Sequence, residues 1–251
     1  MTTADNTGDP PADHAPDDAA QSTSAPELAI EWHPDALRPG FDWNVALPTD
    51  WAVLKTHPAQ WRRQNERIVD DYYGGKRVPA KVRRALLKSL EDAVAVTQKN
   101  RILLTLIHPG VDAEGRIENV SLNLMFTSSS PRLASMAPIR KGLEGKSGTL
   151  DELTTPSGNA YVLAERQEQQ RDGDSVRDVV SIQAFYPLPS TTWTLVIGAT
   201  TPRIDWSKSL RDAVIRMTGS VSWHDSPTVD PSDVGSELPN PISLVSYRVP
   251  K

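Results

Sequence analysis

Two stretches of the chain carry residues whose types and spacing could do chemistry. Gly145-Lys146-Ser147 matches the end of a phosphate-binding loop. The full pattern needs another glycine five residues before Gly145, where this chain has Arg140, and it needs a strand before the loop and a helix after it. The local pattern here indicates a helix before and irregular chain after, so we do not expect nucleotide binding.

The second stretch is His108 with Asp112, Glu114 and Glu118, which could be drawn as an oxygen-rich metal site. The five histidines are His14, His33, His57, His108 and His224. None has a second histidine at metal-ligand spacing, and the acidic stretch is more typical of a solvated hairpin loop.

The serine run Ser128-Ser129-Ser130 has no Gly-x-Ser-x-Gly elbow around it, and it precedes Pro131 as a helix start would. We therefore expect no catalytic, cofactor-binding or metal-ligating residue and no cofactor.

The strongest compositional anomaly is a basic stretch over residues 62–101, with eleven basic residues against five acidic ones. Its candidate partner-binding residues are Arg62, Arg63, Arg67, Lys76, Arg77, Lys81, Arg83, Arg84 and Lys88. They could attract an acidic partner, nucleic acid or an anionic membrane surface. A pair of surface helices with ordinary solvated faces explains the same residues, and we favour that interpretation. The acidic residues 1–31 could also screen the basic stretch.

Charge is distributed unevenly along the chain. The net charge is −5, but residues 1–31 hold seven acidic residues and no Lys or Arg, which leaves 27 basic and 25 acidic residues elsewhere. A nearly neutral body argues against nucleic-acid binding. There are no cysteines, no secretory signal and no apolar run near the ~20 residues of a membrane helix, so we expect a soluble cytoplasmic protein without a membrane span. Its richness in Arg, Ala and Asp suggests a GC-rich bacterial genome.

Composition also divides the chain into three parts. Residues 1–31 are expected to form a disordered acidic arm rich in Pro and Ala, because they hold too little apolar surface to offset the entropy of ordering. Residues 32–223 hold every tryptophan and are expected to form a single α+β domain. Residues 224–251 form a Pro-rich tail with an apolar segment at 242–249. Its docking residues, Ile242, Leu244, Val245 and Tyr247, would either pack back on the domain or add a strand to a partner.

The elements of the domain are organised around residues 179–221. Residues 179–186 read as a strand with apolar residues on both sides, and residues 193–200 alternate as a second strand. The turn 189–191 makes the two a hairpin, and an apolar stripe then predicts a helix that ends near Val221. Asp205 is the expected N-cap of that helix.

The rest of the chain supplies further strands and helices. Strands are predicted at 41–47, 102–107, 119–126 and from Tyr161, and helices at 58–73, at 79–100 with Asn100 as its cap, and at 131–141. Residues 143–158 are expected to be irregular. Short turns between consecutive strands predict a mainly antiparallel sheet of about six strands with helices packed on its faces, an α+β fold layered as an α/β/α sandwich.

This order resembles the Mog1/PsbP-like fold, particularly its uncharacterised actinobacterial members. The resemblance rests on Phe41-x-Trp43…Leu47-Pro48-x-x-Trp51 and on Trp193-Thr-Leu-Val-Ile-Gly-Ala-Thr-Thr-Pro202 followed by a helix ending near Trp223. It covers roughly residues 41–223. It implies a compact partner-binding or accessory domain without an active site, and it carries over no binding residues.

Three functions stay open at this point. The first is a non-enzymatic accessory or chaperone-like protein that binds a protein partner, with a homodimer as one arrangement. The alternative is a small-molecule or lipid-binding module with a cavity between sheet and helices, which a pocket lined by Trp and Leu would favour. The third is an enzyme, which convergent carboxylates or histidines in a cleft would favour.

Overall fold

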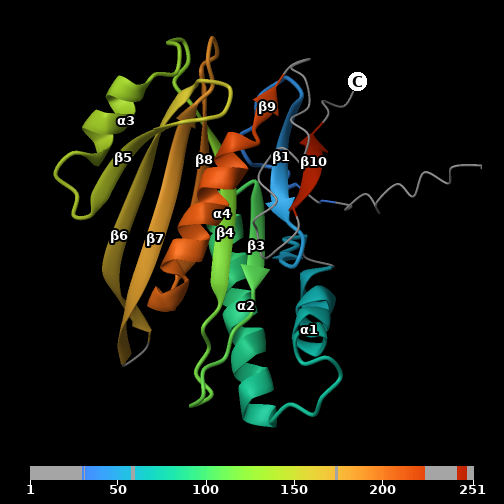
Figure 1. Cartoon of the computed structure of the whole chain (residues 1–251). Coiled ribbons are helices and arrows are strands. Elements are labelled where there is room, and N and C mark those ends of the chain that lie inside the picture. Colours follow the sequence, from blue (N-terminus) through green and yellow to red (C-terminus); the bar gives the residue numbers. More distant parts are fainter. Residues whose placement is uncertain (1–29, 31, 58–59, 173–174, 224–241, 248–251) are drawn as a thin grey trace, which may run out of the picture.

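The computed structural model describes residue 30 and residues 32–57, 60–172, 175–223 and 242–247. Its main feature is a seven-stranded sheet in the order β2-β3-β4-β8-β7-β6-β5, and every neighbouring pair in it is antiparallel. Helices pack against this sheet (Figure 1). The predicted α+β class with a mainly antiparallel sheet is therefore confirmed, with one strand more than the six expected.

The centre of the sheet is the predicted hairpin of β7 (Ser175–Pro187) and β8 (Trp193–Thr201). A short 3-10 helix, η1 (Ile204–Trp206), follows, and then α4 (Ser207–Gly219). The prediction that Asp205 caps α4 is wrong. Asp205 lies inside η1 and accepts a hydrogen bond from Arg203 at 2.9 Å, while Trp206 occupies the N-cap position of α4 without a side-chain cap.

Strand β4 (Val120–Ser128) pairs with β8 over eight residues, from Ser121 opposite Thr200 to Ser128 opposite Trp193. Its other neighbour is β3 (Leu104–His108), which in turn pairs with the short β2 (Ala52–Val53). Beyond β7 the sheet continues with β6 (Ala160–Asp172) and ends at β5 (Thr149–Thr154).

The presence of β5 corrects the expectation that residues 143–158 are irregular. β5 pairs with β6 over six residues, yet most of its side chains are exposed. Because an edge strand with both faces largely solvated needs no apolar alternation, its sequence carries no strand period to detect.

One face of the main sheet holds the principal core. Leu122 and Leu124 of β4 and Ile197 of β8 are at most 1% exposed and belong to one apolar cluster with Leu210 and Val214 of α4. A second, three-stranded sheet helps α4 to cover this face. Its order is β10-β1-β9, formed by Ile242–Tyr247, Trp43–Pro48 and Ser222–Trp223. This layer therefore combines a helix with strands, where the sequence predicted helices alone.

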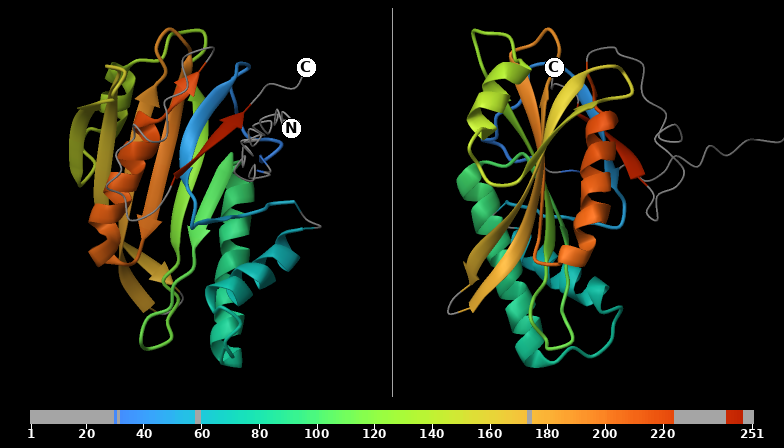
Figure 2. Two further views of the ribbon diagram at one scale, coloured as in Figure 1. Left: turned by 45° about the vertical axis from the view of Figure 1, so that its right-hand side comes forward. Right: turned by 60° about the vertical axis from the view of Figure 1, so that its left-hand side comes forward.

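The opposite face is covered at its two ends by α2 (Ala80–Asn100) and α3 (Met136–Leu143). Figure 2 shows these helices on one side of the sheet and α4 on the other. Leu86, Leu90 and Val94 of α2 pack with Ile107 of β3, while α3 packs on Val162 and Ala164 of β6. α1 (Trp61–Tyr72) packs mainly against α2, and its Gln64 side chain also bonds the Val53 carbonyl of the edge strand β2.

The cap of α2 also differs from prediction. Asn100 is the last helical residue, and Arg101 takes the capping position with a left-handed φ of 51°. The predicted acidic arm, 1–31, lies outside the described residues apart from Ile30, which is half-buried against the principal core.

Candidate functional site

The α1–α2 hairpin places the predicted basic residues on one projecting part of the molecule (Figure 1). α1 stops because Gly74 and Gly75 adopt left-handed φ values of 56° and 75°, and Pro79 occupies the N-cap position before α2. Ile68 and Val69 of α1 are buried on the side that faces the cluster of Leu86, Leu90 and Val94. Polar residues are consequently left on the outer side of the hairpin.

Two of the nine basic residues are neutralised within the hairpin. Arg83 pairs with Asp70 at 2.9 Å, and Lys88 pairs with Asp92 at 2.7 Å. The hydrogen bond to Asp92 and the charge of that carboxylate raise the pKa of Lys88. The other seven form no ion pair with any residue that the structure describes, and all are exposed: Arg62, Arg63, Arg67, Lys76, Arg77, Lys81 and Arg84.

A groove of about 250 Å³ runs between the two helices of the hairpin. Its lining residues recur at helical spacing on both helices: Trp61, Arg62, Asn65 and Glu66 from α1, and Arg84, Leu87, Lys88 and Glu91 from α2. Three cations therefore share the groove with two carboxylates, one aromatic ring and one leucine. The Arg62 guanidinium stacks over the Trp61 ring at 5.1 Å from its centroid.

Asn65 is an anomaly in this groove. It is 1% exposed, and neither its carboxamide nitrogen nor its carboxamide oxygen has a hydrogen-bond partner. In its neighbour Gln64, by contrast, both ends of the carboxamide are hydrogen-bonded, since it donates to the Val53 carbonyl and accepts from the Lys55 amide. An unpaired buried amide costs free energy, so Asn65 contributes less to stability than an apolar residue of its size would.

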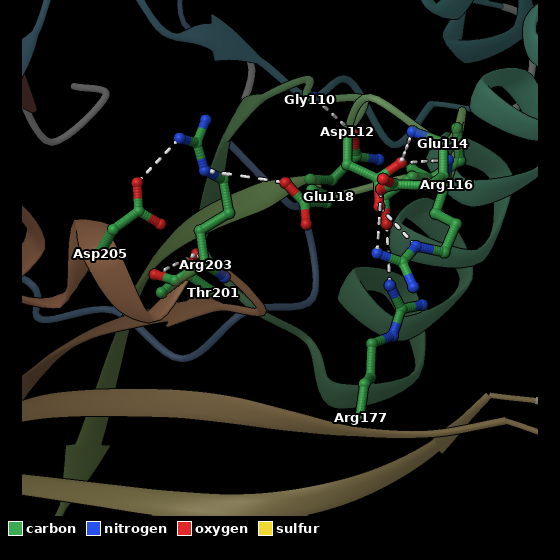
Figure 3. Close-up of polar contacts among 11 residues, drawn as sticks. Gly110, Asp112, Glu114, Arg116, Glu118, Arg177, Thr201, Arg203 and Asp205 are labelled. Carbon is green, nitrogen blue, oxygen red and sulfur yellow. Dashed lines mark hydrogen bonds and ion pairs between the residues drawn. The ribbon is translucent and has the colours of Figure 1, made fainter.

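The structure does not bring His108 and its acidic neighbours together as a metal site. The His108 ring packs between Trp51 and Trp206, with centroid distances of 5.9 and 5.2 Å. Among the described residues, no group of three His, Cys, Asp or Glu side chains could hold a metal ion. The polar contacts in Figure 3 are internal: Asp112 and Glu114 bond Arg116, and Glu118 lies 3.7 Å from Arg203.

Asp112 organises the loop between β3 and β4. Burial acts to raise the pKa of its carboxyl, but hydrogen bonds from the Arg116 side chain and backbone outweigh burial and hold that pKa below its ordinary value. Gly110 closes the same loop by accepting from the Glu118 amide at 2.8 Å. A Cβ at Gly110 would lie 2.5 Å from the Glu118 carbonyl oxygen, so the close approach requires glycine.

The remaining predicted residues have local roles. Gly145-Lys146-Ser147 is exposed and lies between α3 and β5, so a helix precedes it and a strand follows it. Ser129 Oγ donates to backbone carbonyls of Arg132 and Thr192 and thereby fixes the loop after β4. His33 is buried, and its Nδ1 accepts from the Asp35 amide. His57 is exposed, whereas His14 and His224 lie outside the described residues.

The C-terminal docking segment forms strand β10. It runs antiparallel to β1, with Ile242 opposite Pro48, Leu244 opposite Ala46, Val245 opposite Val45 and Tyr247 opposite Trp43. The backbone of this segment therefore lies on the domain, as the docking interpretation requires. Residues 248 and 249 of the predicted segment are outside the described part of the chain.

Sequence reasoning missed a larger cleft of about 430 Å³ between α2 and the centre of the sheet. Ala85, Lys88, Ser89 and Asp92 form its helical wall, and Asn119, Ser121, Thr200 and Val179 come from or adjoin the strands beneath. Because these strands lie far apart in sequence, no local pattern announces the cleft.

No helix in the described part of the chain is both long enough and apolar enough to cross a membrane. No protein-family model, curated protein or solved structure matches the chain. The Mog1/PsbP-like resemblance therefore stays a prediction.

Proposed function

We propose that this protein is a non-enzymatic accessory domain that acts in the cytoplasm and binds an acidic protein partner through the outer surface of the α1–α2 hairpin. The observation that supports it is an excess of exposed cations on one helical hairpin, where seven basic side chains form no ion pair with the described residues. Structural surface helices usually balance such charges with i,i+4 partners, as Lys88 and Asp92 do here. Unbalanced charges favour an oppositely charged partner.

The groove chemistry favours a protein over nucleic acid. Glu66 and Glu91 line the same groove as the cations and would repel a continuous row of phosphates. Trp61 and Leu87 offer apolar contact that a phosphate backbone does not use but a leucine or phenylalanine side chain does. The partner that fits is thus a segment in which acidic and apolar residues alternate.

Binding at such a surface depends on salt, because exposed charges are screened over ~8 Å at physiological ionic strength. We expect charge to set the association rate and the apolar contacts to set the lifetime of the complex. A labelled peptide with alternating Glu and Leu residues serves as the probe, and its fluorescence anisotropy reports binding to the full chain.

The test compares two double substitutions of equal charge. Arg63→Glu with Arg67→Glu reverses two positive charges on the hairpin, whereas Arg132→Glu with Lys141→Glu reverses two exposed positive charges, one before α3 and one within it. We expect the hairpin variant to bind the peptide about tenfold more weakly and the control to bind like the native protein. Equal weakening in both variants would contradict the site. Tighter binding of duplex DNA than of peptide would replace the proposal with a nucleic-acid interface.

A further inference from the structure

The centre of one sheet face is left open between α2 and α3. α2 covers β3 and α3 covers β6, while α4 and the small sheet lie on the opposite face (Figure 2). The side chains of β4, β8 and β7 on the open face are half-buried and mostly polar, and they include Ser121, Asn123, Thr200, Ser181 and Gln183. A solvated face is common in antiparallel sheets, so polarity alone does not make a site.

Strand register orders these residues into a row. Ser121 of β4 lies opposite Thr200 of β8, Thr200 lies opposite Ser181 of β7, and Ser181 lies opposite Arg166 of β6. Four adjacent strands thus present three hydroxyl groups followed by a guanidinium. None of the three hydroxyls makes a side-chain hydrogen bond to another described residue.

Arg166 provides the second observation. Its Nη2 atom is buried and has no hydrogen-bond partner, and the guanidinium forms no ion pair with the described residues. A buried N–H of a cation without an acceptor is costly, and an incoming anion would relieve that cost. By contrast, the preceding residue Glu165, on the other face of the strand, is paired, since its carboxylate lies 3.9 Å from the Arg211 guanidinium.

Gly198 provides the third observation. It lies in the middle of β8, opposite Asn123 and Gln183, and its φ is not left-handed. A Cβ there would meet the Gln183 side chain at 3.7 and 4.0 Å and the Ile182 carbonyl oxygen at 4.0 Å, which are ordinary contacts, so neither packing nor backbone conformation requires glycine. Glycine inside a strand weakens it and often marks a place where a ligand approaches the backbone. Its effect here is that β8 contributes no side chain at this position to the floor of this face beside the hydroxyl row.

The cleft between α2 and the sheet shares two residues with the row, since Ser121 and Thr200 line it. Its volume of about 430 Å³ falls within the range of small-molecule sites. Asn119 holds the wall in place, because its carboxamide donates to Ser89 Oγ of α2 and accepts from the Gly110 amide. The polar floor does not suit a lipid chain, which would leave the hydroxyls unpaired.

We propose that this open face binds a carbohydrate that carries one anionic group. Its hydroxyls would exchange hydrogen bonds with Ser121, Thr200 and Ser181, and its anion would contact the Arg166 guanidinium. Neighbouring strands are ~4.8 Å apart, so the row from Ser121 to Arg166 spans roughly 14 Å, a length that accommodates two sugar rings. This site is separate from the α1–α2 hairpin surface and does not depend on its proposed partner.

The test follows the backbone amides of the ¹⁵N-labelled full chain by NMR during titration with glucose 6-phosphate, glucuronate, glucose and inorganic phosphate. We expect saturable shifts at residues 181, 198 and 200, which one sugar ring anchored at Arg166 can reach, with one or both of the anionic sugars, and at least tenfold weaker binding of glucose and of phosphate. A response to glucose 6-phosphate alone identifies a phosphate ester, and a response to glucuronate alone identifies a carboxylate. Equal binding of inorganic phosphate would mean an adventitious ion site and would overturn the proposal.

Two variants locate the binding. Gly198→Val fills the floor with a residue that suits a strand, so it should abolish binding without lowering the melting temperature. Arg166→Gln should weaken the anionic sugars about tenfold and leave glucose unchanged, whereas the exposed control Arg132→Gln should change neither. If Gly198→Val unfolds the chain, the double variant Ser181→Ala with Thr200→Ala takes its place. The proposed site is overturned if Gly198→Val, or its replacement, and Arg166→Gln both bind the anionic sugars like the native protein. It is also overturned if neither anionic sugar produces a saturable shift.

Discussion

Two asparagines show how differently the same side chain serves this fold. Asn119 joins three segments, since it bonds Ser89 of α2 at 2.9 Å and the Gly110 amide at 3.2 Å. Asn65 is more deeply buried, and its carboxamide bonds none of the described residues. A polar group that is retained at a cost to stability, in a groove lined by charges and an aromatic ring, fits a surface that is completed by a partner.

Asn65→Leu should therefore raise the free energy of unfolding, by about 1–2 kcal/mol, because it removes two unpaired buried polar atoms at similar volume. Asn119→Leu should lower it by about 1–3 kcal/mol, because two hydrogen bonds are lost and their partners are left unpaired. Urea unfolding at neutral pH measures both. A loss in Asn65→Leu as large as that in Asn119→Leu would mean that the Asn65 carboxamide supports the fold.

At the scale of elements, the two sheets differ in what protects their edge strands from pairing with another chain. The exposed edge strand β5 carries Asp151 and Glu152, which pair with Arg211 of α4 and Arg140 of α3. Such charges discourage pairing with another chain. β1 instead holds Val45, Ala46 and Leu47, all at most 1% exposed, and its edge is covered by β10 over six residue pairs. The C-terminal strand β10 thus covers the edge of β1, whose buried residues carry no charge that would discourage pairing with another chain.

Truncation after residue 241 should lower the melting temperature, since it uncovers the edge of β1. A synthetic peptide of residues 242–249 should restore it in proportion to the logarithm of peptide concentration, whereas a scrambled peptide should not. In the full chain, amides within 244–247 that bond to β1 should exchange slowly with solvent. Equal melting temperatures with and without the segment, together with fast exchange, would show that β10 does not hold the edge. A dimer that forms only in the full chain would indicate strand exchange between copies.

At the scale of the molecule, the two faces of the main sheet differ in burial. The face under α4 is buried and apolar, here called the dry face, and the opposite face is partly solvated. The dry face buries Trp43, Tyr161 and Tyr186, whose rings belong to one cluster. The ring centroids of Tyr161 and Tyr186 are 6.3 Å apart. Burial raises the pKa of both tyrosines, and Arg211 near Tyr161 and the polar side chains near Tyr186 oppose this only in part. Both phenols are held neutral by the fold.

This linkage predicts how the protein unfolds in alkali. Because the folded pKa values are raised, the two phenols stabilise the fold below the ordinary tyrosine pKa of ~10, and their contribution is lost as pH rises above it. Tyr161→Phe with Tyr186→Phe should move the alkaline unfolding midpoint to higher pH, while the exposed Tyr72→Phe should not. Absorbance of tyrosinate and circular dichroism follow ionisation and unfolding together. Ionisation of all the tyrosines before unfolding would contradict the burial argument.

The sequence by itself determined the elements whose faces differ in polarity. Alternation in residues 193–200 and the stripe of Leu86, Leu90 and Val94 each require one buried face, so a strand and a helix follow from local period alone. The basic residues of the α1–α2 hairpin were identifiable for the same reason, because they occupy the positions that the apolar stripe leaves free. The antiparallel character of the sheet followed from its short connections.

Only the tertiary structure decided what depends on distant pairing. The row of Ser121, Thr200, Ser181 and Arg166 exists because β8 lies between β4 and β7, and no local period encodes that register. The burial of Asn65 likewise depends on how α1 meets α2, and the strand at 149–154 depends on the neighbour β6 that supplies its hydrogen bonds. A side chain's spacing fixes which face it occupies, but contacts between segments far apart in sequence fix what that face meets.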